Sequence, residues 1–510
     1  MKPIGYQALI EELHLEVLRP WCASYLRSRG SERHTRIEDG RVEEIYPARY
    51  NPGAGWEAQL GFALKHEGVN LEVLRALFEQ VPETELAAWV HQAPMSRYAR
   101  VAWFLYEWLL GQPLPVSGLT QGNYVPVLDP QTCYALPRVG RTLNVARQRV
   151  VNNLPGTPAY CPLVRRTAQL QHYEALQLDQ QAAALLQRFP ADLLYRAAQY
   201  LYLKETKASY AIEHLKADQR RTARFVALLH QAGRQDCFTA QALVQLQRTI
   251  VEERYAASGF RDFQNYVGQS LGPARELVHY VPPKPEDLPA LMAGWMTSCR
   301  GFQAGGVHPV VTAVVAGFGL VFLHPFEDGN GRLHRFLLHH TLAAGKFSPA
   351  GVIFPVSATM LKQLPRYDAA LEDYSREVSL LVEYELDDQG AMQVRGETAR
   401  FYRYPDLTAQ AEALFGFIQD TLRTEMVAEL EHLEVFDAAR QGLRDVVDMP
   451  DRRLDLLLRL CMQGKGRLSK AKREQFPELT DAECRQMETI VQAAIAELKP
   501  EAAAVDAGSG

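Results

Sequence analysis

The most informative twelve residues of the chain read His324-Pro325-Phe326-Glu327-Asp328-Gly329-Asn330-Gly331-Arg332-Leu333-His334-Arg335. The apolar residues before this run predict a buried helix over Pro309–Leu323, and those after it predict a second apolar-faced helix over Arg332–Ala344. The run therefore predicts a short glycine-containing loop between two helices, with the imidazole of His324 at the end of the first helix.

Several residues of this loop suit a phosphate group. Gly329 and Gly331 let the backbone approach a ligand, and the free N–H groups of a helix start favour anions. Arg332 and Arg335 lie three residues apart on one helical face, where two guanidinium groups can bind phosphate oxygens. A single carboxylate among these cationic groups, Asp328, is explained by a hard divalent cation such as Mg²⁺.

A histidine beside such a site can act as a general base, because its pKa lies near neutral pH. Simpler interpretations of the single residues stay open. An Asp-Gly-Asn-Gly run alone is most often a turn, and the arginines could lie on a solvated helix face. Glu327 is expected at the surface, and His339 and His340 are expected to pack or to face solvent. A turn does not explain why base, carboxylate and cations converge, so the run indicates a nucleotide-phosphate site with a base.

The same run resembles the signature of the Fic family, His-Pro-Phe-x-Asp-Gly-Asn-Gly-Arg-x-x-Arg, and matches every fixed position. The resemblance covers roughly residues 190–380. It implies an all-helical core that binds Mg-ATP and transfers AMP to a Ser, Thr or Tyr hydroxyl of a target protein, with release of pyrophosphate. By this resemblance His324 is the catalytic base and Asp328 holds Mg²⁺, and the phosphates are bound by Gly329, Asn330, Gly331, Arg332 and Arg335.

A second segment supports the resemblance. Residues Gly259–Gly268 and then Leu277–Val281 alternate as in a β-hairpin, with turn residues at Gly272-Pro273. They resemble the hairpin flap of Fic enzymes, whose free edge pairs with the backbone of the target. The resemblance implies docking residues Gln264, Asn265, Tyr266, Val267 and Gly268; a hairpin with no docking role is the alternative.

Tyr367 lies where the family often has an aromatic residue that lines the adenosine pocket. We interpret Tyr367 either as such a residue or as part of the core. Leu371 and Tyr374, which follow it, are expected in the core.

The segment Ser209–His214 resembles the inhibitory helix of the family, Ser/Thr-x-x-x-Glu followed by Gly or Asn. Ser209 and Glu213 share a helix face at this spacing. The resemblance implies that Glu213 pairs with Arg335 and thereby keeps the γ-phosphate of ATP out of the site. His214 departs from the pattern, and an ordinary exposed glutamate is the alternative.

The composition fits a folded protein with more than one domain. The chain has 510 residues, of which 47% are hydrophobic and 23% charged, with a formal net charge of -5. This balance gives no sign of a nucleic-acid or membrane-surface protein. Its seven cysteines are scattered, which favours a reduced, cytoplasmic environment. The longest nearly apolar run, Val310–Leu323, is shorter than the ~20 residues of a membrane helix.

The predicted fold class is mainly α, with a β-hairpin flap on the helical core. We expect a helical N-terminal region over residues 1–110 and a Pro- and Gly-rich connection with short strands over 111–167. The Fic core is expected over 168–385, and a helical C-terminal region over 386–498. Within the C-terminal region Thr480 and Glu483 predict a capping box that opens a helix at Asp481. The tail over 499–510 is expected to be disordered.

Three classes of function are weighed. The first is an adenylyltransferase inhibited by Glu213, and the second is AMP removal or another phosphoryl-type transfer on the same fold. The third is a non-catalytic adaptor or DNA-bound regulator, for which the basic residues Lys465–Arg473 could form part of a helix-turn-helix; a solvated helical pair is the favoured interpretation. The expected partner is a target protein on the flap. Self-modification and a homodimer stay open, and no membrane is expected.

Overall fold

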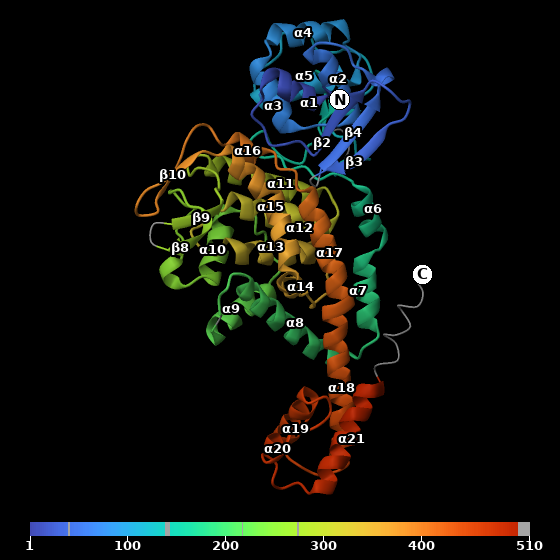
Figure 1. Cartoon of the computed structure of the whole chain (residues 1–510), viewed down its shortest axis with the longest axis vertical. Helices are drawn as coiled ribbons and strands as arrows, with labels where there is room; N and C mark the ends of the chain where they lie inside the picture. The colour runs from blue at the N-terminus through green and yellow to red at the C-terminus, as the bar shows by residue number, and fades with distance from the viewer. Residues whose placement is uncertain (39–40, 138–142, 217, 273–274, 498–510) are drawn as a thin grey trace.

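The computed structural model describes residues 1–38, 41–137, 143–216, 218–272 and 275–497 (Figure 1). It is mainly α, as the sequence predicts, with small sheets in several places. The predicted tail over residues 499–510 and Pro273 of the predicted flap turn lie outside the described residues. No described helix is long and apolar enough to span a membrane, and all seven cysteines are buried without disulfide bonds.

The N-terminal lobe, blue in Figure 1, combines helices with a four-stranded sheet of order β1-β2-β4-β3. The prediction of a helical region is therefore wrong for the four strands, which all lie between residues 2 and 47, and right for the helix among them, α1. The alternation of apolar and polar residues that predicts a strand is absent from this part of the sequence, because the polar side chains of Ser24 and Glu44 are buried. The strands are β1 (Lys2–Ile4), β2 (Cys22–Arg27), β3 (His34–Glu38) and β4 (Arg41–Pro47). The helices are α1 (Tyr6–Leu13), α2 (Trp56–His66), α3 (Leu71–Gln80), α4 (Glu83–Gln92) and α5 (Arg97–Leu110), with a 3₁₀ turn over Ala48–Tyr50.

The connecting region has the short strands that its turn residues predict. They form a three-stranded sheet of order β5-β7-β6, made of β5 (Val125–Pro126), β6 (Asn144–Val145) and β7 (Val150–Val151). Most of the buried side chains of this region pack with the N-terminal lobe, whereas Tyr134 and Tyr160 belong to the main core.

Helix α12 (Pro309–Leu323) lies in the middle of the main core, and α13 (Asn330–Ala344) packs along it. Every side chain from Val310 to Leu323 is buried except that of Val321. Gly317 permits the close approach of the two helices, because a Cβ atom there would lie 2.6 Å from Leu338. The other helices of this core are α6 (Ala168–Ala175), α7 (Leu178–Gln187), α8 (Ala191–Ile212), α9 (Gln219–Leu229), α10 (Ala240–Ile250), α11 (Leu288–Ala304), α14 (Val356–Lys362) and α15 (Leu364–Leu381), with a 3₁₀ turn over Glu253–Tyr255.

Two hairpins lie beside this core on the left of Figure 1: β8 (Val267–Gly272) with β9 (Arg275–Tyr280), and β10 (Tyr384–Leu386) with β11 (Met392–Val394). The first hairpin lies in the predicted flap region, but its first strand begins at Val267, so residues 259–266, expected to alternate as a strand, form no strand. The second lies at the predicted boundary between the Fic core and the C-terminal region.

The main core continues past residue 385, since buried side chains as far as Leu433 belong to it. Helix α17 (Thr408–Asp420), a π-helical segment (Thr421–Met426) and α18 (Val427–Arg444) form one long helix that leads to the C-terminal helices (Figure 1). A separate small core joins α18 to the last helices. The remaining elements are α16 (Arg400–Arg403), α19 (Asp451–Gln463), α20 (Lys470–Arg473) and α21 (Asp481–Glu497). The predicted capping box is present, because the N–H of Thr480 donates to Glu483 at 2.7 Å and the N–H of Glu483 donates to Thr480 at 3.3 Å.

Candidate active site

His324 ends helix α12 in the left-handed conformation, with φ 47° and ψ 58°. Its N–H donates to Leu320 O at 2.8 Å, which closes the last turn of the helix. A left-handed backbone costs a non-glycine residue roughly 1–2 kcal/mol, so the surrounding contacts must hold it. The result is an abrupt change of chain direction that leaves the imidazole at the start of the motif loop.

The tautomer of His324 suits a general base. Its Nδ1 lies 3.2 Å from Val321 O, and since a carbonyl oxygen can only accept, Nδ1 carries the proton of the neutral ring. The lone pair of Nε2 is then free to take a proton. Burial, the largest effect, and the charge of Arg261 together lower the pKa of His324 to about 4, against the opposing effects of the hydrogen bond to Val321 O and the charge of Asp328. The imidazole is therefore neutral at pH 7.

The loop after His324 is held in shape by Asn330. Its side chain accepts from Phe326 N at 3.1 Å and donates to Phe326 O at 2.7 Å. Asn330 is only 2% exposed. The expected contact of its side chain with phosphate is therefore not supported by the structure; Asn330 shapes the backbone that would make such contacts.

The carboxylate of Glu213, at the end of α8, lies at the N-terminus of helix α13, where the sequence predicts a bound phosphate group. Its Oε2 lies 2.8 Å from Arg332 Nε, and its Oε1 pairs with Arg335 Nη2. A Cβ atom on Gly331 would lie 2.6 Å from Glu213 Oε1, so the absence of a side chain at Gly331 admits the carboxylate. A carboxylate thus fills an anion-binding position made by two arginines and a helix N-terminus.

Ser209, one turn before Glu213 on α8, also contacts Arg335. Arg335 donates through Nε to Ser209 Oγ at 2.7 Å and through Nη2 to Ser209 O at 2.8 Å. The contact of Glu213 with Arg335 is the one that the resemblance implies. The contacts of Ser209 with Arg335 and of Glu213 with Arg332 were not predicted. His214 adopts φ 56°, a left-handed conformation that Gly and Asn adopt more easily.

Asp328 is the loop carboxylate predicted to hold a metal ion. Its Oδ1 accepts from Gly329 N and from Arg332 Nη2, both at 2.6 Å. The side chain is 42% exposed, which leaves its other oxygen accessible for a hard cation. The described residues contain no group of three or more His, Cys, Asp or Glu side chains around a common point. One carboxylate fits Mg²⁺, which usually completes its ligands with water and substrate phosphates.

The flap residues divide into two groups. Gln264 donates to Asn265 O and Pro282 O, and Asn265 donates to Phe326 O at 3.2 Å. These two side chains are therefore hydrogen-bonded to the protein's own backbone, and their role in target docking stays a prediction. Val267 and Gly268 are exposed on β8, which pairs with β9 alone among the described strands. The outer edge of β8 is therefore open to a further strand.

Tyr266 and Tyr367 are the other aromatic residues expected at the site. Tyr266 is partly buried at the base of the hairpin and packs against the main core. Tyr367 is 3% exposed, and its hydroxyl lies 3.2 Å from Nδ1 of His334. The structure thus places Tyr367 in the core, the second of its two interpretations, and its burial does not support a contact with adenosine.

Two residues that the sequence did not point to also hold the loop. Gln247 on α10 is fully buried, and its Nε2 donates to Asp328 O at 3.1 Å. Arg261, 6% exposed, donates through Nε to His324 O at 2.9 Å. Arg261 lies in the predicted flap segment Gly259–Gly268 and Gln247 lies outside every predicted motif, but no local signal in the sequence marks the contact of either residue with the loop.

The comparisons agree with this geometry. A model of the Fic/DOC family matches residues 237–342, which include the motif loop and the flap. Residues 237–342 form a Fic/DOC domain. The match does not include α8, so the role of Glu213 rests on the contacts described above.

Several curated relatives of the Fic domain bear the name protein adenylyltransferase Fic. The chain is 33% identical to the one from Culex quinquefasciatus over 122 residues, and 34% identical to the one from Drosophila grimshawi over 119 residues. The matched part is 23% of this chain and 22% of each of these relatives.

Two solved structures match part of the chain. A Fic family protein from Desulfovibrio desulfuricans G20 has 18% identity and a TM-score of 0.36, over 61% of this chain and 87% of that one. A Fic domain containing signaling protein from Bacteroides thetaiotaomicron has 16% identity and a TM-score of 0.32, over 52% of this chain and 95% of that one. Because both TM-scores are low, neither structural similarity supports the assignment of the site.

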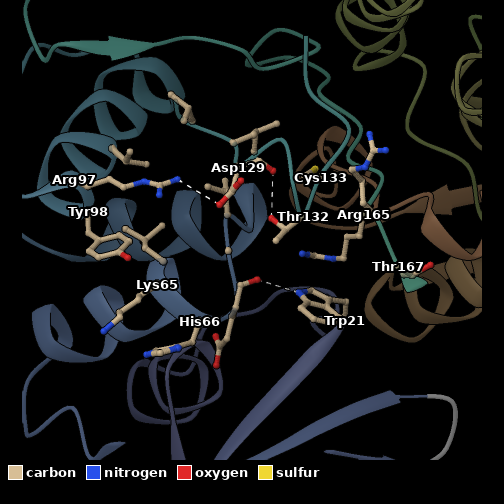
Figure 2. A pocket seen from close by; sticks show the side chains of 18 residues that line it. Trp21, Lys65, His66, Arg97, Tyr98, Asp129, Thr132, Cys133, Arg165 and Thr167 are labelled. Carbon is tan, nitrogen blue, oxygen red and sulfur yellow. Dashed lines mark hydrogen bonds and ion pairs between the residues drawn. The ribbon is translucent and has the colours of Figure 1, made fainter. Parts of the chain in front are cut away.

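A cavity of about 290 Å³ lies outside the Fic domain, between the N-terminal lobe and the connecting region (Figure 2). Its arginines are already paired. Arg97 is turned toward Asp129, 3.8 Å away, as Figure 2 shows, and Arg165 pairs with Asp406 at 2.9 Å. None of the candidate active-site residues lines this cavity.

Proposed function

We propose that this chain is a protein adenylyltransferase that transfers AMP from Mg-ATP to a hydroxyl side chain of a target protein and is inhibited by Glu213. The observation that carries the proposal is the Glu213 carboxylate on Arg332 and Arg335, at the start of the helix that follows a neutral imidazole. The Fic domain and the names of its curated relatives support the same activity.

In the proposed reaction Nε2 of His324 takes the proton of the target hydroxyl. The hydroxyl oxygen attacks the α-phosphorus, a new P–O bond forms, and the bond from the α-phosphorus to the bridging oxygen of pyrophosphate breaks. Arg332 and Arg335, once free of Glu213, neutralise the charge of the polyphosphate. The N–H groups near Gly329 and Gly331 orient it, and such preorganised charge supplies much of the rate.

Asp328 is the residue of this chain that would hold Mg²⁺, and a bound Mg²⁺ would neutralise charge on the phosphates. The open edge of β8 is the proposed docking site of the target, by addition of a strand. This mode holds a target side chain over the loop without requiring a particular sequence in the target.

Two labels of ATP test the reaction type. Full-length Glu213→Gly protein is incubated with Mg-ATP that carries the label on either the α- or the γ-phosphate, and labelled protein is measured. AMP transfer incorporates the α label alone, with release of pyrophosphate. Incorporation of the γ label would show phosphate transfer instead and would overturn the proposal.

A further inference from the structure

Arg261 lies where the flap, the motif loop and the core meet. The backbone N–H of Arg261 donates to Pro325 O at 2.9 Å, and its Nε donates to His324 O at 2.9 Å. Its Nη1 donates to Phe263 O at 2.9 Å, and its Nη2 donates to Pro283 O. One buried arginine therefore connects three parts of the chain: the segment before β8, the segment after β9, and the loop that carries His324.

The contacts follow the loop backbone residue by residue. The carbonyls of His324 and Pro325 both accept from Arg261, and the next carbonyl, that of Phe326, accepts from Asn265. Each of these donors belongs to the segment just before β8. Three successive carbonyls of the motif loop thus accept hydrogen bonds from the segment just before β8.

Only an arginine can make this set of contacts with one side chain. Its guanidinium is planar and donates in several fixed directions, whereas the ammonium group of lysine is a single point of charge. Burial lowers the pKa of Arg261 to about 10, so it stays charged at pH 7, and charged donors make the stronger hydrogen bonds.

We propose that Arg261 is a positioning residue that fixes the flap hairpin and the His324 imidazole at one separation, so that a hydroxyl carried by the flap edge meets the base. This inference rests on the proposed function, because it concerns the alignment of target and base. Arg261 does not touch the reacting atoms, and it acts through the backbone of His324, whose left-handed conformation needs support.

The first test replaces Arg261 by Lys in full-length Glu213→Gly protein. Misplacement by about 1 Å can cost on the order of 10²-fold in rate, so AMP transfer should fall about 10–100-fold while the Kd of Mg-ATP, measured by calorimetry, changes less than about twofold. Arg100→Lys is the matched control. Arg100 is also buried and donates to backbone carbonyls, Asn123 O at 2.7 Å and Arg149 O at 3.4 Å, but it lies in the N-terminal lobe.

A second variant separates alignment from general damage to the fold. Arg261→Ala leaves a cavity that free guanidinium ion can enter, so guanidinium at concentrations well below those that unfold the protein should restore part of the transfer. The same ion should restore nothing in a His324→Ala variant. An Arg261→Ala protein that is folded but not rescued, or a rescue shared by His324→Ala, would overturn the proposal.

A third measurement does not depend on the reaction. The ring resonances of His324, assigned by NMR in the absence of nucleotide, should shift in Arg261→Lys and stay unchanged in Arg100→Lys. If Glu213→Gly protein transfers no AMP, the proposed function fails, and the NMR comparison still decides whether Arg261 positions His324. Unchanged His324 resonances, a loss of transfer no larger than in Arg100→Lys, or a parallel loss of Mg-ATP affinity would each contradict the role of Arg261.

Discussion

Glu213 Oε2 accepts from Arg332 Nε at 2.8 Å, and the second oxygen of the same carboxylate pairs with Arg335. Both arginines lie in the first turns of α13, beside the loop that bears His324. A phosphate group bound by these arginines would meet the carboxylate directly. At an effective dielectric constant of about 20, two like charges ~4 Å apart repel by roughly 4 kcal/mol, so Glu213 and a nucleotide phosphate compete for one site.

Replacing Glu213 by Gly should lower the melting temperature in the absence of ligand and raise the stabilisation by Mg-ATP. Breaking a buried ion pair costs ~3–5 kcal/mol, and the side chain of Glu213 is 23% exposed, so we expect a smaller loss. Bound ligand stabilises the folded state by RT ln(1 + [L]/Kd), which makes the shift with Mg-ATP larger than in wild type. Thermal denaturation with and without Mg-ATP measures both effects.

Asp437→Gly is the matched control, because Asp437 pairs with Arg196 at the other end of α8. This variant should lose some stability and keep the wild-type shift with Mg-ATP. Equal Mg-ATP shifts in wild type, Glu213→Gly and Asp437→Gly would contradict competition at this site.

Replacing His324 by Ala in Glu213→Gly protein should remove AMP transfer and leave the binding of Mg-ATP intact. Loss of a general base typically costs on the order of 10²–10⁴ in rate. Calorimetry with Mg-ATP reports binding, and incorporation of the α label reports transfer. His432→Ala, at an exposed position of α18, should change neither, and near-normal transfer by His324→Ala would show that another group is the base.

Between pH 8 and about pH 5 the rate of transfer should not fall through protonation of His324, because the ring stays neutral. The pKa of His324 is lowered to about 4, below the ordinary value of about 6.5, so the base stays unprotonated until the pH nears 4. The same shift makes the stability contributed by the neutral ring fall as pH decreases through about 6.5, since the unfolded chain then binds a proton that the folded chain does not. An NMR titration of His324 with a midpoint near 6.5 would contradict this prediction.

Removal of Mg²⁺ and loss of its proposed ligand, the Asp328 carboxylate, should weaken ATP binding by equal amounts. In Glu213→Gly protein we expect a chelator to reduce the stabilisation by ATP, because Mg²⁺ bound to one carboxylate joins the protein to the phosphates. Asp328→Asn should bind ATP equally with and without the chelator. A variant Asp328→Asn that still responds fully to Mg²⁺ would show that the ion is held elsewhere. Glu327→Gln, at the exposed neighbouring position, is the matched control and should behave like its parent.

The parts of the site that the sequence predicts are those with a spacing signal. The loop between α12 and α13 follows from an apolar run, two glycines and a charged cluster, and the helix face shared by Ser209 and Glu213 follows from their spacing. The contact of Glu213 with Arg332 could not be predicted in this way, because it depends on how α8 crosses α13. Gln247 and Arg261 were missed for the same reason, since each reaches the loop from a distant part of the chain.

Other differences arise where a side chain turns away from the direction that the motif suggests. Asn330 folds back on Phe326 instead of facing a phosphate group. Tyr367 points to His334, which agrees with the core interpretation of this residue. The N-terminal sheet was missed because its buried polar residues hide the alternation of a strand. The main core also extends to Leu433, beyond the predicted boundary at residue 385.

Incorporation of α-labelled AMP by wild type, Glu213→Gly and Glu213→Gly with His324→Ala tests the central claim most directly. The three full-length proteins are incubated with Mg-ATP, alone and with a cell lysate, and labelled protein is quantified. We expect little label with wild type, a strong increase with Glu213→Gly, and a return to background in the double variant. Equal labelling by wild type and Glu213→Gly, or labelling that survives the loss of His324, would contradict the claim.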